Sequence, residues 1–232
     1  MNNRNCVSTR FGGIVKGAVL CFVIGRCVFQ NRPAVSAQAD QAVTEIRSVN
    51  SHTQTSSKFA TIAVTNGVTY QIGLKGELLT DLTLGLISQM PTIRDLVFQG
   101  GTMQDKISAD GISQLSALTN LDSLHIGCFG KMKPGLFAEI CKLKQLRSLA
   151  LDISMPPPVE YAYITNLDNL EVLKVNGCTN FNNDAAYAIT NLTKLKTLTL
   201  RFDGVSSNVK SSFQLMTNLT LIDIRYGTAP PR

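Results

Sequence analysis

Two residues whose side chains could do chemistry stand close together, His125 and Cys128. A thiol beside an imidazole can act as a nucleophile, provided that a third group orients the base. We find no acidic residue placed to orient His125, and we expect Cys128 to lie in a loop. A zinc site would need four ligands, and the only other histidine, His52, lies in a distant polar stretch. We therefore predict no catalytic residue, no metal site and no cofactor, and keep a Cys128–His125 enzyme as a remote alternative.

The elements that must position these residues follow from a repeated apolar pattern of the form Leu-x-x-Leu-x-Leu. Successive copies start 24 to 28 residues apart. A fixed period of this length indicates a solenoid, and a solenoid builds a surface rather than a pocket. The six clear copies start at Ile93, Leu121, Leu146, Leu170, Leu195 and Leu219.

Each repeat also predicts its own secondary structure. The Leu-x-Leu alternation is typical of a strand. Apolar residues three and six positions before each copy, and nine positions before the first five, indicate a helical or 3₁₀ return. A single unit of this kind buries too little apolar surface to fold alone, so several units must stack. We predict a right-handed coil with short parallel strands on one face and helical returns on the other.

The residues before the first clear copy predict a cap. Asn66-Gly67 separates two β-prone stretches, which favours a hairpin because a two-residue type I′ turn needs positive φ at both positions. Ile72 and Leu74 continue the repeat register as a first rung. We assign residues 59–74 to the cap hairpin and first rung, and residues 75–232 to the solenoid.

These repeats resemble the leucine-rich-repeat family over about residues 69–226. The best match is Leu170-Glu-Val-Leu-Lys-Val-Asn-Gly-Cys178, with Cys178 where the cysteine-containing class of the family places its cysteine. The resemblance implies an α/β fold, a curved solenoid with strands on its concave face and helical or 3₁₀ segments on its convex face. It also implies a non-enzymatic protein that binds a protein partner through the concave strand face.

Outward positions of the predicted strands supply the candidate binding residues. Adjacent parallel strands lie about 4.8 Å apart, so side chains in one column are neighbours. The columns predict a mixed, mainly basic patch toward the C-terminal end; the alternative is a solvated strand face without a partner. The candidate residues are His125, Asp152, Lys174, Asn176, Lys196, Thr199, Arg201, Asp223, Arg225 and Tyr226.

The first 37 residues resemble a secretory signal peptide. They carry five basic residues and no acidic one, and an apolar stretch follows the basic start. We expect cleavage after Ala37 or Ala39, with an uncleaved anchor or a lipoprotein as alternatives. The protein would then be exported to the periplasm, the cell surface or the extracellular space, with no stable membrane insertion and a polar spacer at residues 38–58.

Charge argues against a nucleic-acid partner. The chain has 22 basic and 16 acidic residues, a net charge of +6. Without the five basic residues of the first 37 positions the balance is 17 minus 16, or +1. A nearly neutral body lacks the basic surface that binds DNA or RNA.

Three further expectations concern the rest of the chain. The mature chain keeps three cysteines, Cys128, Cys141 and Cys178, so we expect at least one free thiol. The sequons at Asn191 and Asn218 are better explained as turn devices than as glycosylation sites. After the last rung we expect an open strand edge, which suggests self-association and, as an alternative function, a structural or self-assembling envelope protein.

Overall fold

The computed structural model describes most of the predicted solenoid. The predicted signal peptide and nearly all of the predicted spacer lie outside the described residues. No helix within the described part of the chain is both long and apolar enough to cross a membrane. The described residues are 54–56, 60–65, 68–75, 78–102, 106–129, 132–152, 158–178, 182–202 and 207–226.

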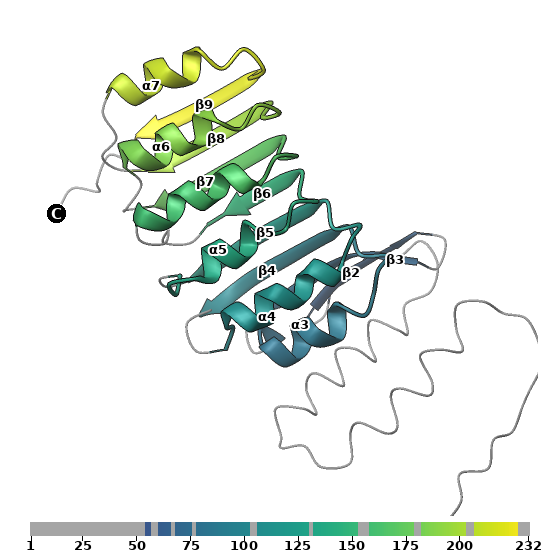
Figure 1. Cartoon of the computed structure of the whole chain (residues 1–232). Coiled ribbons are helices and arrows are strands. Elements are labelled where there is room, and N and C mark those ends of the chain that lie inside the picture. The colour runs from purple at the N-terminus through teal and green to yellow at the C-terminus, as the bar shows by residue number, and fades with distance from the viewer. Residues whose placement is uncertain are drawn as a thin grey trace, which may run out of the picture. The chain divides into compact units, whose positions relative to one another are not determined.

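The strands form one sheet of nine, arranged in chain order (Figure 1). The first three strands pair antiparallel, and the seven from β3 to β9 are parallel to one another. The strands are β1 (Gln54–Ser56), β2 (Ala60–Thr65), β3 (Val68–Lys75), β4 (Asp95–Thr102), β5 (Ser123–Phe129), β6 (Ser148–Leu151), β7 (Val172–Cys178), β8 (Thr197–Phe202) and β9 (Leu221–Tyr226).

Pairing between the parallel strands follows the repeat of the sequence. The second leucine position of each copy pairs with the same position of the next, as in Leu96 with Leu124 and Leu124 with Leu149. The third position does the same, as in Val175 with Leu200. The leucine-rich-repeat solenoid predicted from the sequence is therefore confirmed, with a sheet that stays open.

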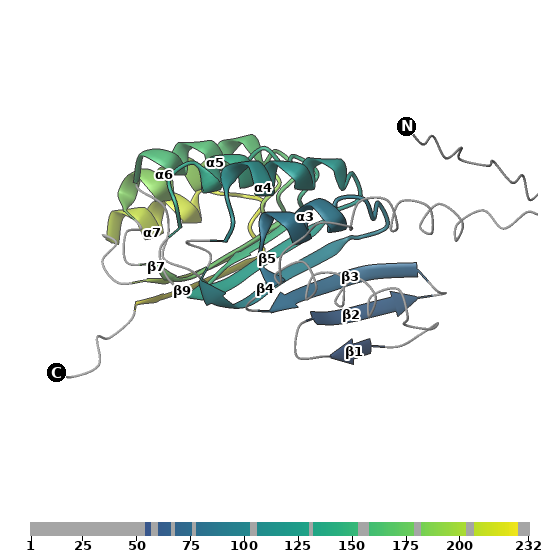
Figure 2. The ribbon, with the colours of Figure 1, turned by 90° about the horizontal axis from the view of Figure 1, so that it is seen from below.

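Helical segments return the chain between the strands, on one side of the sheet (Figure 2). Side-chain caps start three of them, where Thr80, Ser108 and Asn182 accept a backbone N–H of the first turn. The segments are α3 (Asp81–Ile87), α4 (Ala109–Ser113), the 3₁₀ segment η2 (Gln114–Ala117), α5 (Leu136–Ile140), the 3₁₀ segment η3 (Pro158–Asn166), α6 (Asn183–Thr190) and α7 (Ser207–Gln214).

The N-terminal hairpin is confirmed by the antiparallel pairing of β2 with β3. Its predicted turn, Asn66-Gly67, lies outside the described residues. Ile72 pairs with Leu96, so β3 is the predicted first rung. The sequence did not predict β1, which adds a third antiparallel strand from within the predicted spacer.

The core lies between the sheet and the returns. Most residues of the predicted inward columns are buried there, and Phe137 and Tyr161 of neighbouring returns meet edge to face with ring centroids 6.3 Å apart. Cys141 is fully buried in the same layer and is a free thiol, as expected for at least one cysteine.

The last rung is less well covered than the others. Leu198 of β8 is 0% exposed, whereas Ile222, at the same position in β9, is 40% exposed. Leu221, the preceding residue, and Leu215, which follows α7, are also exposed. The C-terminal end of the described solenoid therefore presents apolar side chains to solvent.

Candidate functional site

The candidate site is the face of the sheet that points away from the helices, which we call the open face (Figure 2). No described element covers it. Strand pairing places its predicted columns in register, so same-column residues are neighbours across the sheet. One column runs through Val97, His125, Ala150, Lys174, Thr199 and Asp223.

A second column lies beside the first. Gln99 pairs with Gly127 at its start, and Asn176 pairs with Arg201 farther along. Arg225 and Tyr226 continue β9 and pair through their backbones with Arg201 and Phe202, but their side chains lie outside the described set. The open face thus brings together seven predicted residues with described side chains: His125, Asp152, Lys174, Asn176, Thr199, Arg201 and Asp223.

Three of these residues form a hydrogen-bonded chain across β5, β6 and β7. The Nε2 atom of His125 lies 2.8 Å from Oδ2 of Asp152, and the amide of Asn176 donates to Oδ1 of the same carboxylate. Our expectation that no acidic residue could orient His125 was therefore wrong. Asp152 follows β6, and the sequence could not show that its side chain turns back toward the previous strand.

The neighbourhood of His125 offers little further chemistry. Cys128 lies within β5 rather than in a loop, which corrects that prediction, and its side chain is outside the described set. The described residues contain no group of three or more His, Cys, Asp or Glu that could hold a metal ion. The strand neighbours of His125 are small or apolar, since Val97 and Ala150 pair with it on the two adjacent strands and Gly127 lies two residues farther along β5.

Lys174 and Arg201 differ from the other cations near the sheet. Both side chains are exposed, and within the described part of the chain neither makes a hydrogen bond or an ion pair. By contrast, Arg94, Arg147 and Lys196 are each paired with a carboxylate. The open face therefore carries two positive charges that no described group neutralises.

The paired cations belong to a separate structure, a charge ladder at the edge where the parallel strands begin. Its members alternate in sign along successive repeats, with Arg94 Nη1 3.0 Å from Asp122 Oδ2 and Arg147 Nη1 2.8 Å from Glu171 Oε1. Lys196 Nζ lies 2.6 Å from Glu171 Oε2. Lys196 thus lies on this edge and not on the open face, although we had grouped it with the binding residues.

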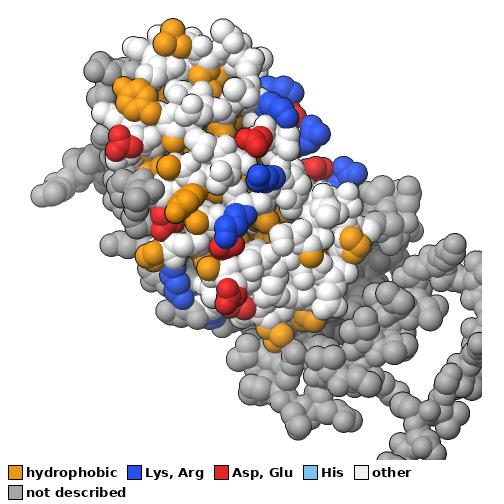
Figure 3. All heavy atoms as spheres, viewed as in Figure 1, with side chains coloured by type: hydrophobic (Ala, Val, Ile, Leu, Met, Phe, Trp, Pro, Cys, Tyr) orange, Lys and Arg blue, Asp and Glu red, His pale blue; other side chains and the backbone are white. Residues whose placement is uncertain are grey.

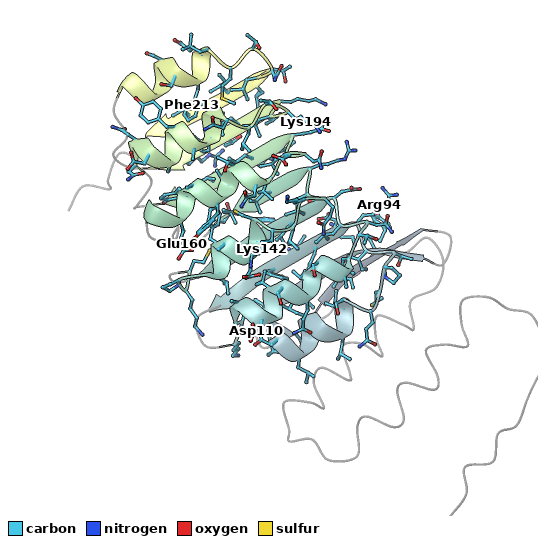
Figure 4. The ribbon with its side chains drawn as sticks, viewed as in Figure 1. Arg94, Asp110, Lys142, Glu160, Lys194 and Phe213 are labelled. Atoms are coloured by element: carbon cyan, nitrogen blue, oxygen red, sulfur yellow. The ribbon has the colours of Figure 1, made fainter. Side chains whose placement is uncertain are left out.

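Figure 3 shows Lys, Arg and acidic side chains gathered along this edge, and Figure 4 labels Arg94 and Lys194 there. The hydrogen bond from the Lys196 ammonium lowers the pKa of the Glu171 carboxyl, and the Arg147 guanidinium lowers it further. Glu171 is therefore held in its charged form between two cations of the neighbouring repeats.

A second ladder on the same edge, built from side-chain amides, was not predicted from the sequence. Asn120 donates to the Pro91 carbonyl at 2.8 Å, Gln145 to Leu118 at 3.1 Å, and Asn169 to Lys144 at 2.9 Å. Asn218 bonds to the Thr193 carbonyl in the same way. The signal was present as an Asn or Gln directly before the first leucine position of these repeats.

The two sequon asparagines therefore have structural partners. Asn218 belongs to the amide ladder, and Asn191 ends α6 by donating to the carbonyls of Tyr187 and Ala188. Both contacts fit the predicted role as turn devices.

Comparison with known proteins gives likenesses of fold only. No family model matches the sequence. No curated protein matches it either. An internalin from Listeria monocytogenes is similar over 67% of this chain, with 17% identity and a TM-score of 0.47; the chain spans 43% of that protein's length.

Two other solved structures have similar identities. A leucine-rich-repeat protein from Leptospira interrogans matches 84% of this chain and 59% of its own, with 15% identity and a TM-score of 0.36. The leucine-rich-repeat ectodomain of a receptor kinase from Arabidopsis thaliana matches 86% of this chain and 99% of its own, with 17% identity and a TM-score of 0.33. No function is transferred to the chain from these proteins.

Proposed function

We propose that the protein is a non-enzymatic module that binds a protein partner on the open face of its sheet and acts outside the cytoplasm. The observation that carries the proposal is the open face itself, a row of parallel strands in register with no described element over it. Its outward side chains stand on a rigid repeat framework, which lowers the ordering cost of binding.

The composition of the open face supports recognition rather than catalysis. His125 and Asn176 both bond to Asp152, so the three side chains form a fixed polar surface on the open face. Lys174 and Arg201 add exposed charge. The site of action is inferred from residues 1–39 alone, whose pattern is that of an export signal.

A site-specific photo-crosslinking experiment tests this function. A crosslinking residue is placed at Thr199 on the open face and, as a control, at Tyr187, which is exposed on α6. We expect a partner to be captured from native extract at position 199 and not at 187, and the purified partner to bind the unmodified protein. Capture at 187 alone, or loss of binding after purification, would contradict the proposal.

Self-association through the C-terminal edge is a second candidate function. The specific observation is that the final described strand exposes two apolar side chains, Leu221 at 53% and Ile222 at 40%, and that Leu215 before it is 81% exposed. An uncovered strand with apolar side chains can pair with another chain. A second copy could in this way cover the end of the core.

Light scattering distinguishes this candidate. If copies join through β9, the molar mass rises with concentration, and replacing Leu221 and Leu215 by lysine keeps the protein monomeric. A matched pair of lysines at Tyr163 and Tyr187, exposed on the helical side, leaves the assembly unchanged. A wild-type monomer at every concentration rules out self-association while leaving the open-face proposal intact.

A further inference from the structure

The two uncompensated cations of the open face stand close enough to act together. Lys174 lies opposite Thr199 and Asn176 lies opposite Arg201 across β7 and β8, so Lys174 and Arg201 are diagonal neighbours. Diagonal positions on adjacent strands are about 7–8 Å apart at the backbone, within reach of two long side chains. Their ammonium and guanidinium groups can therefore meet the same ligand.

Neither Lys174 nor Arg201 forms an ion pair among the described residues, although Asp152 and Asp223 lie at the neighbouring strands. Elsewhere on the open face the described charges are used internally, as where Asp95 accepts a hydrogen bond from Gln71 at 2.7 Å. Asp152 is likewise bonded to His125 and Asn176. Two neighbouring cations without a counterion repel each other, and an arriving anion relieves that repulsion.

We propose that Lys174 and Arg201 bind carboxylates of an acidic segment in the protein partner; this inference rests on the proposed function of the open face. A guanidinium holds a carboxylate through two parallel N–H donors, and a lysine ammonium adds a point charge beside it. Thr199, which lies opposite Lys174 and two residues before Arg201, supplies a neutral polar contact to the same segment.

The surroundings favour a protein carboxylate over nucleic acid or an anionic membrane. Asp152 follows β6, the strand before that of Lys174. Asp223 lies in β9, the strand after that of Arg201, and pairs with Thr199. A phosphate backbone or a lipid surface needs an extended basic area, and it would meet these carboxylates on either side. A short acidic peptide can contact the basic pair and avoid them.

Fluorescence anisotropy at low ionic strength tests the inference with a labelled poly-glutamate peptide. We expect wild-type protein to bind it, and Lys174→Glu and Arg201→Glu each to weaken binding by about tenfold or more. Lys144→Glu is the matched control, because Lys144 is exposed in the turn before β6 and undergoes the same charge change away from the open face. Thermal unfolding should be unchanged in all three variants, since the replaced side chains are exposed.

Poly-lysine, a single-stranded oligonucleotide and phosphatidylserine vesicles complete the design. Absence of poly-glutamate binding, or equal losses in the Lys144 variant, overturns the inference. Stronger binding of the oligonucleotide or the vesicles through Lys174 and Arg201 also overturns it, in favour of that class of ligand. A third outcome is a partner that crosslinks at Thr199 and binds both charge-reversed variants with the affinity it has for wild type. That result is compatible with the proposed function and contradicts only the inference that the partner is bound through an acidic segment.

Discussion

Cys141 shows how one residue's chemistry is set by its place in the coil. Burial raises the pKa of its thiol, and the carboxylate of Glu160 raises it further. The thiolate is the reactive form of cysteine, so a buried thiol with a raised pKa is inert. Cys141 therefore acts as a packing residue, although a free cysteine can suggest a redox role.

We therefore expect Cys141 to resist alkylation in the folded protein. Labelling with iodoacetamide, followed by peptide mass spectrometry, should leave the Cys141 peptide unmodified until denaturant is added. Cys141→Ala should leave the fold intact, and Cys141→Ser should lower stability by about 1–3 kcal/mol because a hydroxyl is placed in an apolar layer. Rapid labelling of Cys141 under native conditions would contradict its burial.

Glu171 gives a pH dependence of defined sign. Lys196 and Arg147 lower the pKa of its carboxyl in the folded state, so the charged form is bound more strongly by the folded protein than by the unfolded chain. The stabilisation is present above the unfolded pKa and is lost as the pH falls through the lower, folded pKa.

Glu171→Gln should therefore lower the thermal midpoint by a few degrees at most at neutral pH, because the two cations paired with this half-buried carboxyl are exposed and such ion pairs are weak. The difference from wild type should shrink as the pH is lowered into the acidic range. Asp168→Asn is the control, since Asp168 is exposed in the preceding turn and has no described ion pair. If the difference in thermal midpoint between Glu171→Gln and wild type grows as the pH is lowered, the charge ladder does not act through this carboxylate.

At the scale of elements, neighbouring returns are joined by their caps. The Asp81 carboxylate in the first turn of α3 accepts the Ser108 N–H at 2.8 Å and the Ser108 hydroxyl at 2.7 Å. Ser108 in turn caps α4 by accepting the Gly111 N–H at 3.1 Å. Asp81 of α3 therefore holds in place the residue that caps α4.

Gly111 must stay small for this contact. A Cβ there would lie 1.8 Å from Asp81 Oδ1 and 3.2 Å from the Asp81 backbone, so Gly111→Ala would displace a carboxylate held by two hydrogen bonds. We expect it to lower the free energy of unfolding by about 1–3 kcal/mol in urea denaturation.

Gly85 in α3 supplies the matched control for Gly111. A Cβ at Gly85 would meet the side chain of Gln114, with Oε1 nearest at 2.4 Å, and this exposed side chain can rotate away. Gly85→Ala should thus be neutral or stabilising by up to about 1 kcal/mol, because alanine favours helix. Equal losses for both variants would mean that the Asp81 contact has no special role.

At the scale of the whole molecule, the repeat made the fold predictable. The period separated inward from outward positions, so the pairing of His125 with Ala150 and of Lys174 with Thr199 followed from counting. The sequence could not predict which outward groups neutralise one another. The bond from Asp152 to His125 depends on rotamers, and strand β1 depends on pairing in a segment without periodicity.

The same repeat makes the stability of the molecule uneven along its axis. Each unit gains most of its burial from its two neighbours, and the final described unit has only one. Leu198 and Ile222 occupy equivalent positions in adjacent strands, yet the first is 0% and the second 40% exposed. Replacing each of these two residues by alanine therefore measures how much the stacking of neighbouring units contributes to stability at that position.

We expect Leu198→Ala to lower the free energy of unfolding by about 2–5 kcal/mol, because it leaves a cavity in a closed core. Ile222→Ala should cost about 1 kcal/mol or less in dilute solution, because its apolar surface is already partly in water. Urea denaturation measures both values, and hydrogen exchange should show faster amides in β9 than in β8. If copies join through β9, the cost of Ile222→Ala rises with protein concentration because a partner then buries that side chain. A large cost in dilute solution would instead mean that the last rung is closed within the monomer.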